Sequence, residues 1–161
     1  HGEHGVTSVK SGAFADNKTL KSVILPESVK RLDGAVFQGC ENLEYVSMIG
    51  IEDMIFANIN TAYSPNETVC TNNNFFLCAS LRTVVVGKNF NLYPDGNTGA
   101  QQFPGSSGKT DIYVYGGEEE SNVNCDAGTN NGMLSGNVYY YSESKAENRW
   151  RFVDGKATLW E

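Results

Sequence analysis

The sequence has only two histidines, His1 and His4, and both lie near the N-terminus, where chains are usually poorly ordered. A Ser/His/Asp or Cys/His site needs a histidine held in the fold, so this scarcity argues against nucleophilic catalysis of that kind. Lysine and arginine number 12 against 19 acidic residues, and the net charge of −7 without a cationic cluster argues against nucleic acid as a partner. The sequence also lacks an apolar run of about 18 residues, so no segment is predicted to span a membrane.

A three-residue hydrophobic spacing runs through the stretch GAVFQGCENLEYVSM, residues 34–48. This spacing fits neither an amphipathic helix, with a period of about 3.6, nor a half-buried strand, with a period of about 2. The segment 23 residues earlier repeats it, and the template V-x2-[VL]-x4-F-x2-[CN]-x2-L-x2-V-x-[LM] describes both copies. The matched positions are Phe14, Asn17, Leu20, Val23 and Leu25 in the first copy and Phe37, Cys40, Leu43, Val46 and Met48 in the second.

Three later segments follow the same template less evenly. A third good copy contains Phe75, Cys78, Leu81, Val84 and Val86. A degraded copy contains Phe103, Ser106, Lys109, Ile112 and Val114, and a weaker one between the second and third copies contains Ile51, Phe56, Ile59 and Ala62. Repetition over units of this length is typical of solenoids, in which one coil cannot bury its apolar face alone but stacked coils share a core.

The end of each unit, L-x2-V-x-L, predicts a short strand with one buried face, because alternation points Val23 and Leu25 inward and Ile24 outward. Stacking would align these strands into a parallel sheet, with the phenylalanines filling the interior from the opposite wall. Cys40 and Cys78 share one interior position, so we expect them to be buried thiols rather than disulfide partners. No C-x2-C pair occurs, and neither a metal site nor a cofactor is predicted.

The units AFADNKTLKSVILPESVKRL and VFQGCENLEYVSM resemble leucine-rich repeats of the BspA type, and the likeness covers residues 6–115. The resemblance implies a leucine-rich-repeat solenoid of the α/β superhelix class, β-rich with short parallel strands and few helices. It also implies a bacterial cell-surface or secreted protein that acts through binding, with adhesion to host matrix proteins as the inherited expectation. Because the chain begins in mid-repeat at Val6, we expect the targeting segment upstream.

The C-terminal segment predicts a cap for the solenoid. Val138–Tyr141 reads as one more strand, and RWRFVDGKATLW reads as a hairpin about Asp154 and Gly155. It is also similar to the closing segment of some such proteins from gut bacteria. We expect residues 1–136 to form about five irregular coils and residues 137–161 to cap them, and a chain ending before Asn137 to be insoluble or unfolded. Four residues are predicted to plug the end of the core: Trp150, Phe152, Leu159 and Trp160.

The outward side of the predicted sheet is the candidate binding surface. In register, the copies place Ser22, Tyr45 and Thr83 in one column and Ile24, Ser47, Val85, Tyr113 and Tyr139 in the next. We call these eight residues the outward face. Exposed tyrosines and aliphatic residues would suit a protein or glycan ligand, because aromatic groups dominate binding hot spots. The alternative is that they simply suit β geometry.

Two other functions are compatible with the sequence. A carboxylate-based hydrolase could use the loops 88–111 and 116–133, although the run Glu118–Glu120 is more typical of a solvated loop. Asp95–Gly99 could hold calcium but lacks several carboxylates, which favours a plain turn. The third possibility is a structural spacer that carries another module outward from the cell wall.

Overall fold

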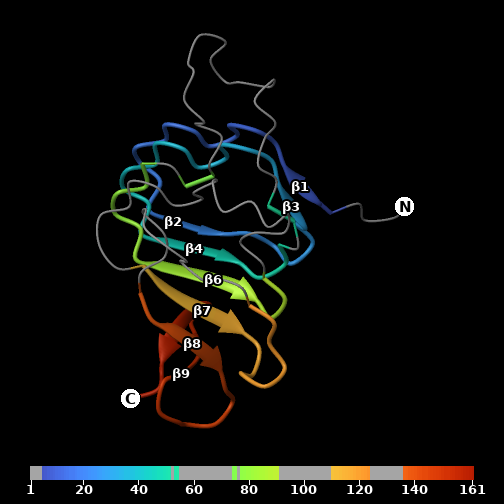
Figure 1. The fold of residues 1–161 in the computed structure, drawn as a ribbon. Coiled ribbons are helices and arrows are strands. Elements are labelled where there is room, and N and C mark those ends of the chain that lie inside the picture. The colour runs from blue at the N-terminus through green and yellow to red at the C-terminus, as the bar shows by residue number, and fades with distance from the viewer. Residues whose placement is uncertain (1–4, 52, 55–73, 76, 91–109, 124–135) are drawn as a thin grey trace, which may run out of the picture.

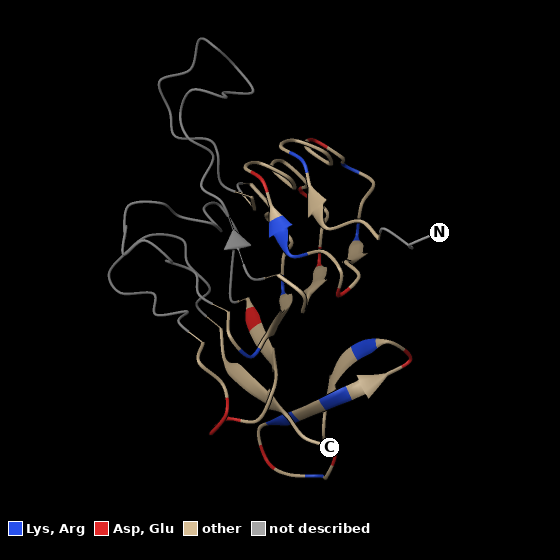
Figure 2. Cartoon of the chain, turned by 90° about the vertical axis from the view of Figure 1, so that its right-hand side faces the viewer, with Lys and Arg blue, Asp and Glu red and all other residues tan. Residues whose placement is uncertain are grey.

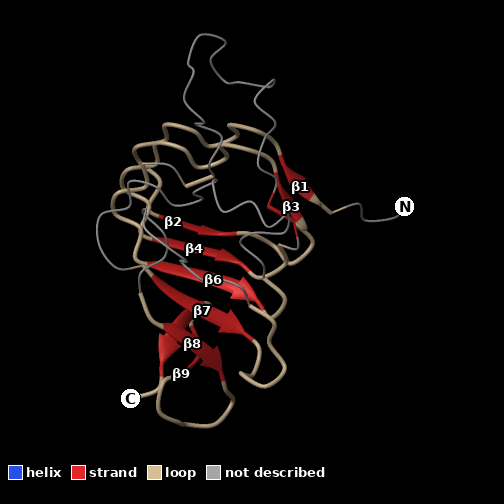
Figure 3. Cartoon of the chain, in the orientation of Figure 1, coloured by secondary structure: helices blue, strands red, loops and turns tan. Residues whose placement is uncertain are grey.

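The computed structural model describes residues 5–51, 53–54, 74–75, 77–90, 110–123 and 136–161. All the regular elements in this part of the chain are strands (Figure 1 and Figure 3). They are β1 (Ser8–Val9), β2 (Ser22–Ile24), β3 (Arg31–Leu32), β4 (Tyr45–Met48), β5 (Asp53–Met54), β6 (Thr83–Gly87), β7 (Asp111–Tyr115), β8 (Val138–Tyr141), β9 (Arg149–Val153) and β10 (Lys156–Leu159).

The larger sheet has the strand order β10-β9-β8-β7-β6-β4-β2, and its neighbouring strands pair in parallel except for β9 and β10, which pair antiparallel. Val46 of β4 pairs with Val23 on one side and with Val84 on the other, which is the register that the repeat template predicts. The order of β2, β4, β6, β7 and β8 down one wall is visible in Figure 1. The strands predicted at the end of each unit and at 138–141 are therefore confirmed.

A second, smaller sheet consists of strands that the repeat template did not predict. It contains β1, β3 and β5 in parallel, and Val9 pairs with Leu32. These two residues occupy the same template position, five residues before the phenylalanine, so the repeat places them together although each strand has two residues. The first two coils therefore bend between a short strand of this sheet, β1 or β3, and a strand of the larger one, β2 or β4.

The third coil is longer than the second. Ser22 pairs with Tyr45, 23 residues on, whereas Tyr45 pairs with Thr83, 38 residues on, so the third coil carries 15 more residues. β4 and β6 are direct neighbours in the larger sheet. Residues 55–73 of this coil lie outside the described residues.

The phenylalanine position forms a stack through successive coils. The rings of Phe14 and Phe37 lie 5.5 Å apart and nearly parallel, and those of Phe37 and Phe75 lie 5.4 Å apart. Phe37 and Phe75 are fully buried, while Phe14 in the first coil is 39% exposed. Together with the inward aliphatic residues of the sheet they form what we call the solenoid core: Leu25, Val29, Leu32, Val36, Phe37, Cys40, Leu43, Val46, Met48, Ile51, Phe75, Cys78, Leu81, Val84, Val86, Phe90, Ile112 and Val114.

The cysteine position links each coil to the one before it. The thiol of Cys40 donates to the carbonyl of Phe14 at 3.1 Å, and that of Cys78 donates to the carbonyl of Phe37 at 3.2 Å. Both are buried and unbridged, which confirms the expectation of buried thiols. Burial raises the pKa of Cys78 to about 12, so this thiol keeps the proton that it donates. Cys70 and Cys125 lie outside the described residues.

The C-terminal hairpin forms where the sequence predicts it. β9 and β10 pair antiparallel, and the turn residues Asp154 and Gly155 have φ values of 50° and 77°. Two successive positive φ values are those of a type I′ turn, whose twist matches that of the flanking strands. β9 also pairs with β8, so the hairpin continues the larger sheet beyond β8. Figure 2 shows the hairpin at this end of the sheet, near the C-terminus.

Candidate binding surface

The register of the larger sheet brings the eight residues of the outward face together as two columns. Tyr45 pairs with Ser22 and with Thr83, which gives the first column. The second column follows from consecutive pairs: Ile24 with Ser47, Ser47 with Val85, Val85 with Tyr113, and Tyr113 with Tyr139. The predicted alignment of these residues is therefore confirmed.

The predicted exposure of the outward face is correct at one end and wrong in the middle. Ile24 is 56% exposed and Ser22 is exposed, whereas Tyr45, Thr83 and Tyr139 are half-buried. The three remaining residues are buried: Ser47 at 3%, Val85 at 0% and Tyr113 at 8%. They are covered because the C-terminal hairpin folds back over this side of the sheet.

A second hydrophobic cluster joins the hairpin to the outward face. Its buried members are Val85, Tyr113 and Trp150, and the half-buried residues packed against them are Tyr45, Ile49, Tyr139, Tyr141, Phe152 and Ala157. We call this set the face cluster. It shares no residue with the solenoid core among the described residues. The prediction that Trp150 and Phe152 plug the end of the core is therefore wrong, because both lie on the other side of the sheet.

Trp150 is the centre of the face cluster and is fully buried. Its ring meets Tyr113, Tyr141 and Phe152 edge-on, at centroid distances of 5.8, 5.3 and 4.9 Å. The indole Nε1 donates to the carbonyl oxygen of Val114 at 3.0 Å, so its one polar group is satisfied. Edge-to-face contacts of this kind add to the stabilisation that area burial gives.

Tyr45 connects the hairpin to the strand β4. Its hydroxyl accepts a hydrogen bond from the backbone N–H of Ala157 at 3.1 Å, and the ammonium of Lys156 lies 5.9 Å from its ring centre. Burial raises the pKa of Tyr45, and burial followed by the Asp111 carboxylate raises the pKa of Tyr113 to about 12. Both phenols therefore stay neutral at physiological pH and act through packing and hydrogen bonds.

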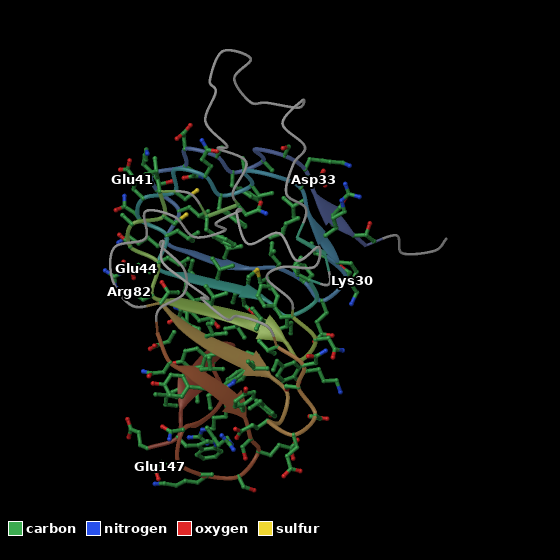
Figure 4. The ribbon with its side chains drawn as sticks, in the orientation of Figure 1. Lys30, Asp33, Glu41, Glu44, Arg82 and Glu147 are labelled. Carbon is green, nitrogen blue, oxygen red and sulfur yellow. The ribbon has the colours of Figure 1, made fainter. Side chains whose placement is uncertain are left out.

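Charged side chains lie beyond the ends of the strands of the larger sheet and on both sides of β3 in the smaller sheet. Figure 4 labels Glu41, Glu44 and Arg82 on the side where the strands begin, and Lys30 and Asp33 on the side where they end. None of the eight residues of the outward face is charged. An uncharged centre with a charged rim is the usual anatomy of a protein-binding surface.

A groove of ≈ 400 Å³ follows the ends of the strands, beside the face cluster. Glycines form part of its wall: a Cβ at Gly50 would overlap the carbonyl of Glu27, and one at Gly87 would lie 2.6 Å from the carbonyl oxygen of Ile49. The coils can therefore stack this closely only without side chains at these points. Tyr115 and Tyr141 close the groove at the hairpin end.

Two of the three carboxylates considered for hydrolysis, Glu118 and Glu120, are engaged in ion pairs. Glu118 lies 2.8 Å from Nη2 of Arg149, and Glu120 lies 3.5 Å from the ammonium of Lys88 and accepts a hydrogen bond from the N–H of Gly117. In the described ranges, no group of three or more His, Cys, Asp or Glu residues could hold a metal ion. Asp95–Gly99 and most of the two candidate loops lie outside the described residues.

The packing of the hairpin against the outward face was not predicted from the sequence. The sequence does indicate this packing. Trp150 and Phe152 are two residues apart in β9, so both point to one side of the strand, and Val85 and Tyr113 form an apolar surface on the outward face. Two apolar surfaces in one chain bury each other when the connection allows it. The loop between β8 and β9 is long enough to turn the hairpin over the sheet.

A family model for the BspA type leucine rich repeat region matches residues 3–96 in six copies. Neither the curated proteins nor the solved structures contain a match to this chain. Within the described residues, no helix has the length and apolar character needed to cross a membrane.

Proposed function

Because the chain belongs to the BspA-type leucine-rich repeat family, whose repeats form protein-binding modules, we propose that it binds a protein ligand at the bacterial cell surface without catalysing a reaction. The ligand would be a host matrix protein or a protein on another cell, and it would dock on the outward face. This assignment follows the family's general use of repeats for binding and its surface association.

The observation that supports this site is the accessible end of the outward face. Ile24 is 56% exposed, and it shares this end of the sheet with Ser22 and the half-buried Tyr45. A parallel sheet with a packed core behind it holds these side chains in fixed positions, which lowers the entropy lost on binding. Tyrosine is also among the residues enriched in binding hot spots.

The test is binding of the protein to an array of host matrix proteins and glycans, with two matched variants. Ile24→Ser removes an exposed aliphatic side chain on the outward face, and Val6→Ser removes one that is 64% exposed before β1. We expect Ile24→Ser to weaken binding about tenfold and Val6→Ser to leave it unchanged. Equal effects of both variants would contradict the site. Binding to glycans alone would contradict a protein ligand, and no binding at all would favour the spacer function.

A further inference from the structure

The two sides of the larger sheet are covered by structures that are held in different ways. The inward side belongs to the solenoid core, which runs through successive coils. The outward side is covered by the hairpin through the face cluster, which is separate from that core. Parts of a fold that share few buried contacts can open independently of one another, so the hairpin and the solenoid are candidates for separate opening.

The hairpin is joined to the sheet by few backbone pairs. β8 and β9 share two register pairs, whereas β6 and β7 share five. The loop residues 143–148 between β8 and β9 are exposed, and Asn148 has a positive φ of 57°. An isolated two-stranded hairpin is marginally stable in water. The order of this hairpin therefore depends on its packing against the outward face.

The contacts that the hairpin makes define the chemistry that the covered surface accepts. At the centre of the covered surface, the indole of Trp150 lies between Tyr113 and Tyr141, and its N–H donates to the carbonyl of Val114. At the other end of this surface, the hydroxyl of Tyr45 accepts a hydrogen bond from the backbone N–H of Ala157. A surface of this kind fits an extended protein segment that presents a large aromatic side chain.

We propose that the hairpin is a displaceable occupant of the outward face, which opens while the solenoid stays folded, and that a protein segment presenting a large aromatic side chain takes the place of Trp150. This extends the proposed function, since it names the chemistry and the control of the same surface. Opening exposes Ser47, Val85 and Tyr113, which are buried when the hairpin is docked. The partner therefore competes with the protein's own hairpin.

Thiol labelling measures the opening without any partner. In the 161-residue chain with Cys70→Ser and Cys125→Ser, Val85→Cys places a thiol beneath the hairpin and Ile24→Cys places one at the open end of the same face. Buried Cys40 and Cys78 remain as internal reporters of solenoid unfolding. Labelled positions are identified by peptide mass mapping.

We expect the thiol of Val85→Cys to react at least about tenfold slower than that of Ile24→Cys and at least about tenfold faster than Cys78. If the thiol of Val85→Cys reacts at the same rate as Cys78, the hairpin does not open separately from the solenoid. If it reacts as fast as the thiol of Ile24→Cys, the hairpin does not cover the outward face. If Val85→Cys does not fold, the wild-type chain provides the test. Both tryptophans, Trp150 and Trp160, lie in the C-terminal segment, so their fluorescence should change at lower urea than the circular dichroism of the sheets. Coincident transitions would overturn the proposal.

A second arm tests the aromatic site. Adding Trp150→Ala to Val85→Cys should speed labelling of the thiol at least about tenfold, and free indole should slow it again by filling the vacated site. The matched control is Trp160→Ala, because Trp160 donates to the carbonyl of Ser142 and lies against Arg151 instead of the outward face. An absence of any indole effect would overturn the proposed aromatic partner. Because no arm uses a matrix protein, failure here is distinct from failure of the proposed function.

Discussion

The solenoid core takes residues from the same positions of successive coils, whereas the face cluster takes them from distant parts of the chain. In the core, Phe37 stacks on Phe14 and Phe75, and one inward residue of each strand meets its equivalent in the next. In the face cluster, Trp150 of β9 meets Tyr113 of β7. Repetition is therefore enough to specify the core. The face cluster needs particular side chains at single positions.

This difference has a consequence for how each region responds to damage. A solenoid transmits a defect to neighbouring coils, because each coil is stabilised mainly by the interfaces on its two sides. The hairpin has an interface on one side only, so damage to it should remain local. Four substitutions separate the two regions by experiment.

Phe37→Ala should have the largest effect, because this ring is fully buried between two others. We expect a loss of about 3–5 kcal/mol in the free energy of unfolding, measured by urea titration with circular dichroism. The control is Phe14→Ala, which removes the same side chain where it is 39% exposed and stacked on one side. A loss for Phe14→Ala as large as that for Phe37→Ala would contradict a core held by stacking on both sides.

Phe152→Ala should affect the hairpin and leave the solenoid almost unchanged. The ring is half-buried and meets Trp150 at 4.9 Å and Tyr115 at 5.4 Å. We expect the hairpin to lose about 1–2 kcal/mol, less than for a fully buried ring. The urea midpoint seen by tryptophan fluorescence should fall while the midpoint seen by circular dichroism stays within error. If both midpoints fall together, the two regions unfold as one unit.

The two regions also differ in how far the sequence predicts them. The template predicted the strand register from Val23 to Ile112, the interior phenylalanines and the buried thiols of Cys40 and Cys78, because the same spacing recurs in successive coils. It also predicted the hairpin, since Asp154 and Gly155 suit a turn with positive φ at both positions. These elements depend on local pattern.

The destination of the hairpin depends on contacts that no local pattern specifies. An aromatic side chain such as Trp150 suits the end of a core and an exposed sheet equally well, so composition alone does not choose between them. The same limit applies to the outward face: alternation predicted that Val85 points away from the core, and the hairpin then buried it. Whether residues 137–161 are needed for solubility stays a prediction, as does ligand binding at the eight residues.

Cys78→Ala should destabilise the solenoid moderately. The thiol donates to the carbonyl of Phe37, and its loss leaves that buried acceptor without this donor. We expect a cost of about 1–2 kcal/mol in the free energy of unfolding, with both optical probes affected if the coils are coupled. Cys78→Ser keeps a donor at the same position, so it can retain a hydrogen bond to the carbonyl of Phe37 that Cys78→Ala lacks. Identical stability of Cys78→Ala and the wild type would show that the bond contributes nothing.

The smallest expected effect concerns Glu120, at the groove beside the face cluster. The N–H of Gly117 and then the ammonium of Lys88 favour the charged carboxylate, so the pKa of Glu120 lies below its ordinary value of 4.5. A depressed pKa means that the folded state holds the charged form more strongly than the unfolded chain does. The resulting stabilisation is present above pH 4.5 and is lost as the pH falls through the folded pKa.

Lys88→Met separates the two causes. The side chain of Glu120 is exposed, so the effect should appear in an NMR titration of its carboxyl carbon more clearly than in any unfolding curve. We expect the pKa of Glu120 to rise towards 4.5 without reaching it, because the N–H of Gly117 still donates. Lys10→Met, which removes one of the two cationic partners of Asp33 in the first coils, should leave this titration unchanged. If the pKa of Glu120 is unchanged in Lys88→Met, the whole shift comes from the hydrogen bond of the Gly117 N–H, and the Lys88–Glu120 ion pair does not contribute to it.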